Sequence, residues 1–149
     1  MQVNEKINAV LDRKGRDVFS VGPQMTVYEA VQAMADRDVG ALVVMDQGRV
    51  VGLFSERDYA RKIVLLGKHS KETLVREVMS SPAATVTPDD SIDSCMRRMT
   101  ELRLRHLIVL DGDRVAGVVS IGDLVNWIIS AQDEIIGQLH GYISGSYPA

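Results

Sequence analysis

The chain carries an internal duplication with a constant offset of 65 positions. Residues 50–58 (VVGLFSERD) recur as residues 115–123 (VAGVVSIGD). The same offset holds without a gap from the pair Val21/Val86 to the pair Asp58/Asp123. A repeat of this kind is one supersecondary unit that buries its apolar face against its neighbour. The duplication therefore predicts two matched halves with two matched sites, in contrast to a single active centre.

Composition limits the class of protein. With 149 residues, 46% of them hydrophobic, the chain is long enough for a core and too short for several independent domains. The formal net charge is -3 and Lys and Arg are scattered, which argues against a nucleic-acid partner. The first residues lack an apolar signal segment, and the longest apolar runs, near residues 41–45, are far too short for a membrane span. We therefore expect a cytoplasmic protein without a membrane partner.

Each repeat follows the order strand, helix, strand, strand, helix. In the first repeat, a capped amphipathic helix is expected to end at Gly40. Residues 41–45 are suited to a buried strand, and residues 50–54 to the second strand of a hairpin. Ser55 then caps a further helix, for which Gly67 is the expected end.

The predicted fold class is α+β, with two pseudo-symmetric repeats packed sheet to sheet. Three short strands with helices on one side leave the other sheet face bare, so neither half is expected to be stable alone. The predicted boundaries are a lead-in helix (1–17), the first repeat (18–67), a connector (68–82), the second repeat (83–130) and a C-terminal helix and tail (131–149).

Two further apolar features bear on packing and assembly. Cys95 is the single cysteine, on the expected inner face of a helix, and its predicted role is packing. Residues 124–139 carry more apolar surface than one helix of a small monomer usually hides. That surface predicts a homodimer formed through helices. Its apolar residues are Trp127, Ile128, Ile135, Ile136 and Leu139.

The repeated segment also places a serine and an aspartate at a helix start, as Ser55 with Asp58 and as Ser120 with Asp123. Free backbone N–H groups at a helix start accept phosphate. A carboxylate one turn in accepts two hydrogen bonds from a vicinal diol, as in dinucleotide folds. The alternative is that each pair is only a helix cap, but its recurrence at the same place favours a site for sugar and phosphate.

Three basic residues are candidates for the phosphate. Arg57 in a first helical turn opposes the helix dipole, which favours contact with an anion; the alternative is a solvated arginine paired with an acid. Arg105 and His106 precede the strand at Leu107. We expect them to face the mouth of the second site.

These residues resemble a stand-alone tandem pair of cystathionine-beta-synthase (CBS) domains, also called a Bateman module. The resemblance covers nearly the whole chain and rests on residues 52–59 (GLFSERDY), 105–109 (RHLIV) and 117–124 (GVVSIGDL). At Ile108 the chain departs from the common pattern, in which many relatives have proline. The resemblance implies disc-like dimers and an adenosine-containing ligand in clefts between the repeats. AMP is the first expectation, and ADP, ATP, NAD(H) and S-adenosylmethionine stay open.

The resemblance also assigns roles by position. Ser55 and Asp58 would hold ribose and phosphate in the first site, with Arg57 on phosphate. Ser120 and Asp123 would do the same in the second site, aided by Arg105 and His106. The adenine contacts would come from the first strand of each repeat and from the opening of the second, that is from Ser20, Val21, Gly40, Ala41, Thr85, Val86, His106 and Leu107.

The function that follows is signal transduction by a regulatory sensor. Binding of AMP, ADP or ATP would shift the relative pose of the repeats and so alter contact with an unidentified regulated protein. An NAD(H) or S-adenosylmethionine sensor, or a ligand-free interaction module, are the alternatives. We expect no enzyme activity, no catalytic cofactor and no metal site. The glycine spacing of residues 117–122 does not fit a nucleophile elbow, and residues 67–69 (GKH) do not fit a phosphate-binding loop.

Overall fold

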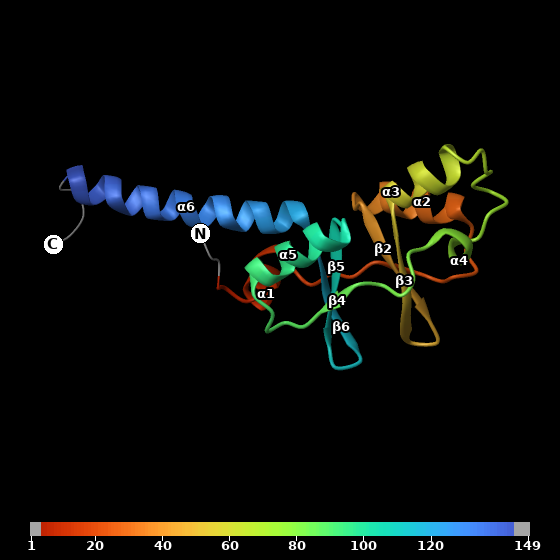
Figure 1. Ribbon diagram of the computed structural model, residues 1–149, viewed down its shortest axis with the longest axis horizontal. Coiled ribbons are helices and arrows are strands. Elements are labelled where there is room, and N and C mark those ends of the chain that lie inside the picture. Colours follow the sequence, from red (N-terminus) through yellow and green to blue (C-terminus); the bar gives the residue numbers. More distant parts are fainter. Residues whose placement is uncertain (1–3, 145–149) are drawn as a thin grey trace.

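The computed structural model describes the backbone of residues 4–144 and the side chains of residues 4–137. The two repeats lie side by side along the long axis, and helix α6 (Ile121–Ser144) extends past them (Figure 1). Residues 1–3 and 145–149 lie outside the described residues, as does the side chain of Leu139.

The element order confirms the predicted repeat. The first repeat holds β1 (Ser20–Val21), α2 (Val27–Arg37), β2 (Ala41–Asp46), β3 (Arg49–Ser55), α3 (Glu56–Asp58) and a π-helical turn, η1 (Tyr59–Val64). The second holds β4 (Thr85–Val86), α5 (Ile92–Leu102), β5 (His106–Asp111), β6 (Arg114–Ser120) and α6. Each sheet has three strands in sequence order, with a parallel first pair and an antiparallel second pair.

The ends of two helices differ from the prediction. Helix α2 ends at Arg37 and not at Gly40, because Asp38 takes the left-handed conformation (φ 53°) and its N–H donates to the carbonyl of Ala35. Aspartate tolerates this conformation better than most residues. The turn η1 likewise ends at Val64, before Gly67 (φ 66°).

The lead-in segment packs on the second repeat, which is distant from it in sequence. The connector packs on the first repeat, which precedes it. Helix α1 (Ile7–Lys14) joins the second repeat, where the N–H of Ile7 donates to the carbonyl of Asp90 at 2.8 Å. Helix α4 (Val75–Val78) joins the first repeat, where the N–H of Val75 donates to the carbonyl of Met25 at 2.9 Å. The chain thus crosses between the repeats twice, which ties them into one body.

Gly52 and Gly117, which are equivalent in the duplication, leave room for these crossing segments because they have no side chain. A Cβ on Gly52 would lie 2.9 Å from the carbonyl oxygen of Ser80 and 2.7 Å from Sδ of Met79. A Cβ on Gly117 would lie 2.7 Å from Cδ2 of Leu11. At both positions the close approach is made by the chain itself.

Three apolar clusters make up the core. One lies in each repeat, and the third lies between the two sheets around Val43, Leu53 and Ile108. The third cluster confirms the predicted sheet-to-sheet packing. Ile108 is fully buried in β5 and paired with Thr85 and Val118, and the register shift of the β5–β6 pair comes only after Val109, so the strand continues through this departure from the family pattern.

The predicted packing roles of Cys95 and α6 can also be placed. Cys95 is fully buried in the core of the second repeat, which confirms its packing role. Trp127 and Ile128 pack against the same core, whereas Ile135 and Ile136 are 52% and 62% exposed. Within the described chain, no helix has both the length and the apolar character to cross a membrane.

Candidate ligand-binding clefts

Two clefts lie where the repeats meet, and the 65-residue offset relates one to the other. The first cleft has a volume of about 830 Å³ and is lined by residues 40, 53, 55–58, 61, 62, 80, 82–84, 98 and 102–106. The second has about 380 Å³ and is lined by residues 14, 15, 17, 19, 38–41, 106, 118, 120 and 123. Each combines the Ser–Asp segment of one repeat with the helix-to-strand junction of the other. Both Ser–Asp pairs therefore face clefts, as the sequence predicts.

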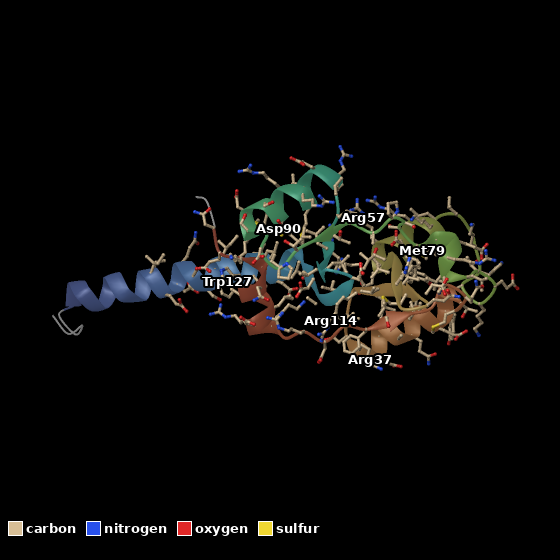
Figure 2. The ribbon with its side chains drawn as sticks, turned by 90° about the horizontal axis from the view of Figure 1, so that it is seen from below. Arg37, Arg57, Met79, Asp90, Arg114 and Trp127 are labelled. Atoms are coloured by element: carbon tan, nitrogen blue, oxygen red, sulfur yellow. The ribbon has the colours of Figure 1, made fainter. Side chains whose placement is uncertain are left out.

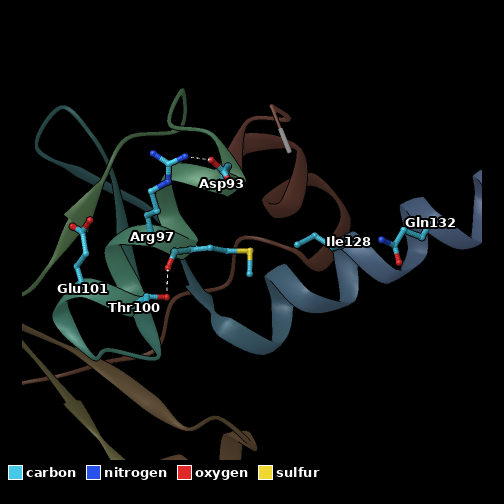
Figure 3. Close-up of a pocket in the computed structure, with 7 residues that line it drawn as sticks. Asp93, Arg97, Thr100, Glu101, Ile128 and Gln132 are labelled. Carbon is cyan, nitrogen blue, oxygen red and sulfur yellow. Dashed lines mark hydrogen bonds and ion pairs between the residues drawn. The ribbon is translucent and has the colours of Figure 1, made fainter. Parts of the chain in front are cut away.

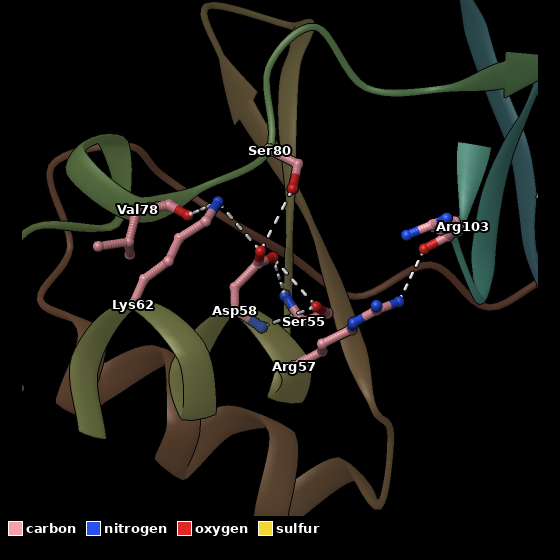
Figure 4. Close-up of polar contacts among 7 residues, drawn as sticks. All are labelled: Ser55, Arg57, Asp58, Lys62, Val78, Ser80 and Arg103. Atoms are coloured by element: carbon pink, nitrogen blue, oxygen red, sulfur yellow. Dashed lines mark hydrogen bonds and ion pairs between the residues drawn. The ribbon is translucent and has the colours of Figure 1, made fainter. Parts of the chain in front are cut away.

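The Ser55–Asp58 pair forms a reciprocal cap that fixes both side chains. Ser55 Oγ accepts from the N–H of Asp58 at 3.2 Å, and Asp58 Oδ2 accepts from the N–H of Ser55 at 2.9 Å. The other oxygen, Oδ1, lies 3.1 Å from Lys62 Nζ and 3.3 Å from Ser80 Oγ (Figure 4). Asp58 is only 8% exposed, so this carboxylate is held rigidly at the cleft wall.

The Ser120–Asp123 pair repeats the cap but has a different cationic partner. Asp123 Oδ2 accepts from the N–H of Ser120 at 2.8 Å and lies 2.6 Å from Lys14 Nζ, which comes from α1. Burial alone would raise the pKa of Asp123. The hydrogen bond from Lys14, the backbone hydrogen bond from Ser120 and the charge of Lys14 outweigh burial, so this pKa lies below its usual value. Asp123 is therefore an ionised carboxylate at neutral pH.

The helix starts are already partly hydrogen-bonded within the chain. The N–H of Glu56 donates to the carbonyl of Gly40 at 3.0 Å, and the N–H of Ile121 donates to that of Arg105 at 2.8 Å. The N–H groups of Asp58 and Asp123 are taken by the serine caps. An anion bound at this place would therefore depend more on cationic side chains than on free backbone N–H groups.

Arg57 joins the two repeats across the first cleft. Its Nη1 donates to the carbonyl of Arg103 at 2.7 Å, and the side chain lies where the repeats meet (Figures 2 and 4). Arg57 thus bridges the two repeats at the first cleft.

The remaining predicted residues fall into three groups. Arg105 lines the first cleft and not the second, which corrects the expectation, because each cleft takes its strand opening from the opposite repeat. Gly40 and His106 line both clefts, and Ala41 lines the second. The strand residues Ser20, Val21, Thr85 and Val86 are absent from both linings; instead their preceding neighbours, Phe19 and Ala84, line the second and the first cleft.

His106 lies in the wall that the two clefts share. A Cβ on Gly40 would lie 3.6 Å from His106 Nε2 and 3.4 Å from Glu56 Oε1, so the two repeats touch here. Burial is the main cause that lowers the pKa of His106, opposed by the charge of Asp123. The imidazole is therefore neutral at pH 7.

The cleft residues that sequence reasoning missed are mainly charged. They are Lys14, Asp17, Asp38, Glu56, Arg61, Lys62, Arg98 and Arg103. The density of arginines over residues 97–105 is the one sequence signal for them.

The family model of the CBS domain matches residues 12–65 and again residues 75–130. The chain belongs to the CBS domain family. It is 40% identical over 127 residues to the mitochondrial CBS domain-containing protein CBSX3 of Arabidopsis thaliana, covering 82% of this chain and 62% of that protein's length. It is 31% identical over 118 residues to the CBS domain-containing protein YhcV of Bacillus subtilis, covering 79% and 84%.

A solved structure supports the same assignment. The structure of a putative signal-transduction protein with CBS domains from Burkholderia ambifaria superposes with a TM-score of 0.83 at 44% identity, covering 86% of this chain and 96% of that one. CBS domain proteins are generally regulatory or signal-transduction modules.

Proposed function

We propose that this CBS protein is a regulatory sensor that binds an adenosine nucleotide and passes the ligand state to a partner protein. The observation that carries the proposal is the composition of the first cleft. It combines a rigid carboxylate, Asp58, with six cationic side chains: Arg57, Arg61, Lys62, Arg98, Arg103 and Arg105.

The chemistry of these groups suits a nucleotide. The Asp58 carboxylate has acceptor sites for a ribose diol, and its cap with Ser55 fixes its direction. Guanidinium groups bind phosphate oxygens in pairs, which makes arginine well suited to the phosphate end. Leu53, Ala83, Ala84 and Leu104 supply apolar surface for the base.

The position of the cleft links binding to regulation. Arg57 and Asp58 belong to the first repeat, whereas Arg98, Arg103 and Arg105 belong to the second. A ligand held by both groups stabilises one relative pose of the repeats, and it shifts a conformational equilibrium only through such differential contacts. The readout by the regulated protein requires no catalysis by this chain.

AMP is the first candidate ligand, followed by ADP and ATP. NAD(H) and S-adenosylmethionine carry the same adenosine group and form the alternative, and a ligand-free interaction module is the other. The predicted cytoplasmic location stays a prediction; the Arabidopsis relative is named as mitochondrial.

A thermal-shift panel tests the proposal. The purified chain, stripped of nucleotide, is heated with AMP, ADP, ATP, NAD, NADH, S-adenosylmethionine or GTP. A ligand at about 100 times its Kd adds roughly 2.7 kcal/mol of stability, so a selective rise with adenosine compounds is expected. No rise with any of them would contradict the proposal and favour the interaction module.

Substitution then locates the site. Asp58→Asn keeps the shape of the cap and removes the charge, and it should weaken binding by about 1.5–3 kcal/mol. Asp123→Asn is the matched variant in the second cleft and should leave binding in the first unchanged. Unaltered affinity in Asp58→Asn would contradict the ribose role of Asp58.

We also propose a homodimer formed through helices. The surface that favours it includes Ile129, Ile135 and Ile136, which are at least half exposed on α6. Beside it, a hollow of about 460 Å³ lies between α5 and α6, lined by Met96, Thr100 and Ile128 among others (Figure 3). Light scattering at micromolar concentration should give a dimer, and Ile135→Asp with Ile136→Asp should weaken it. A wild-type monomer would contradict this proposal.

A further inference from the structure

We infer that the two clefts are selective for ligands of opposite charge character. The first cleft takes an adenosine nucleotide with its negatively charged phosphate groups, and the second takes an adenosine compound that carries a neutral or cationic group in place of the phosphates. The inference rests on the proposed function and extends it to the identity of each ligand.

The internal duplication supplies the comparison, because each cleft has its counterpart in the same chain. None of the six cations of the first cleft has a cationic counterpart 65 positions away. The pairs are Arg57 with Gly122, Arg61 with Asn126, Lys62 with Trp127, Arg98 with Ala33, Arg103 with Asp38, and Arg105 with Gly40. The backbone plan and the Ser–Asp cap are the same in both clefts, so the clefts differ in volume and in the charge of their lining residues.

The second cleft carries acidic residues at positions where the first cleft has none. Asp38 takes the place of Arg103, and Asp17 takes the place of Pro82. Together with Asp123 they put three carboxylates around this smaller cleft. Among the residues that line it, the one lysine, Lys14, lies 2.6 Å from Asp123 Oδ2 and donates to the carbonyl of Val118 at 2.8 Å, so its charge is already paired. In the first cleft Lys62 is paired in the same way with Asp58, and the five arginines there outnumber the two carboxylates, Glu56 and Asp58.

The sign of these charges decides which ligand group each cleft accepts. Phosphate oxygens gain charge-assisted hydrogen bonds from the first set and meet repulsion from the carboxylates of the second. A second cleft that keeps Asp123 for a ribose diol would still accept adenosine, and its carboxylates would attract a sulfonium or an ammonium group. S-adenosylmethionine is the cationic probe of this kind.

Titration calorimetry with ATP, adenosine and S-adenosylmethionine tests the inference. The wild-type chain should bind one ATP, and a chain saturated with ATP should still bind adenosine or S-adenosylmethionine. Arg98→Gln with Arg105→Gln should weaken ATP binding on the order of tenfold or more, from the loss of two charge-assisted contacts. Arg97→Gln is the matched control, because Arg97 lies on the same helix, α5, but lines the hollow beside α6.

The converse variant is a gain of function. Asp17→Asn with Asp38→Asn removes two exposed carboxylates without a change of side-chain shape, and asparagine suits the left-handed conformation at position 38. This variant should bind ATP more tightly at a second site, with a stoichiometry that approaches two per chain.

The experimental outcomes distinguish the charge selectivity of the clefts from the proposed nucleotide-sensor function on which it rests. Two equivalent ATP sites in the wild type would overturn the inference and leave the nucleotide sensor standing. So would an ATP stoichiometry of one in the Asp17→Asn, Asp38→Asn chain at high ATP, if thermal unfolding shows that this chain is folded. Absence of binding by every adenosine compound would overturn the proposed function itself.

Discussion

Lys14 Nζ lies 2.6 Å from Asp123 Oδ2, so the last residue of the helix that opens the chain is anchored at the second cleft. The two residues are 109 positions apart. At the equivalent place in the first repeat, the connector supplies Ser80, whose hydroxyl lies 3.3 Å from Asp58 Oδ1. Both cleft carboxylates are thus held from outside their own helix, one by a charge and one by a hydroxyl.

The substitution Lys14→Met tests this anchor, since methionine stands at the equivalent position 79. The ion pair is partly exposed, so we expect a loss of about 1 kcal/mol in the free energy of unfolding, measured in urea. The pKa of Asp123 should rise toward its usual value in an NMR titration. Lys6→Met is the control, because the Lys6–Asp89 pair is largely exposed; an equal effect of both variants would contradict the role of the anchor.

Because different segments cross Gly52 and Gly117, we predict that alanine substitutions at these two glycines destabilise the fold to different extents. Gly52→Ala would place a Cβ 2.9 Å from a backbone oxygen of Ser80, whereas the Cβ of Gly117→Ala meets the movable end of Leu11. We expect Gly52→Ala to cost about 1–3 kcal/mol and Gly117→Ala to cost less. Gly22→Ala has open space around its Cβ and serves as the control. Equal costs at 52 and 117 in urea unfolding would show that the connector yields as easily as a side chain.

We predict that the folded protein loses stability in mild acid because of His106. Its folded-state pKa lies below the ordinary value of 6.5 because burial disfavours the charged ring. As the pH falls through 6.5, His106 becomes protonated in the unfolded chain while it stays neutral in the folded chain. The free energy of unfolding therefore decreases. Urea unfolding at a series of pH values should show this decrease, and His106→Gln should reduce it.

The exposed His69 supplies the control for that series. His69→Gln removes a surface histidine and should leave the decrease in place. A wild-type profile that is flat between neutral pH and mild acid would contradict the neutral state of the half-buried His106.

We predict that the thiol of Cys95 is unreactive in the folded chain. Burial, helped by the charge of Asp90, raises its pKa to about 11. At pH 8 roughly one thiol in a thousand would then be ionised. Ellman's reagent should therefore react slowly with the native protein and quickly in denaturant. Rapid reaction of the native chain would show that α5 opens readily.

The fold could be predicted from the sequence wherever its causes are local. Caps such as Ser55 and the hairpin turns act over a few residues, and the 65-residue repeat carries each local prediction over to the second half of the chain. The predicted strand order is correct. The predicted end of α2 at Gly40 is wrong because Asp38, two residues earlier, adopts the left-handed conformation that ends the helix.

The clefts were less predictable because they depend on contacts between distant segments. The sequence predicts Arg105 at the second cleft, whereas it lines the first, because the sequence alone does not show that each cleft pairs the Ser–Asp segment of one repeat with the strand opening of the other. Arg98, Arg103 and Lys14 were missed for the same reason. Their importance emerges only once α5 and α1 are placed against the clefts.

An NMR titration with ATP tests the central claim most directly. For a chain of 16.4 kDa, the backbone amides can be followed one by one. The account predicts that the largest shift changes fall on residues 55–58 and 102–106, from the two repeats, with smaller changes at Lys14 and Asp17. Absence of changes at saturating ATP, or changes centred on the hollow between α5 and α6, would contradict it.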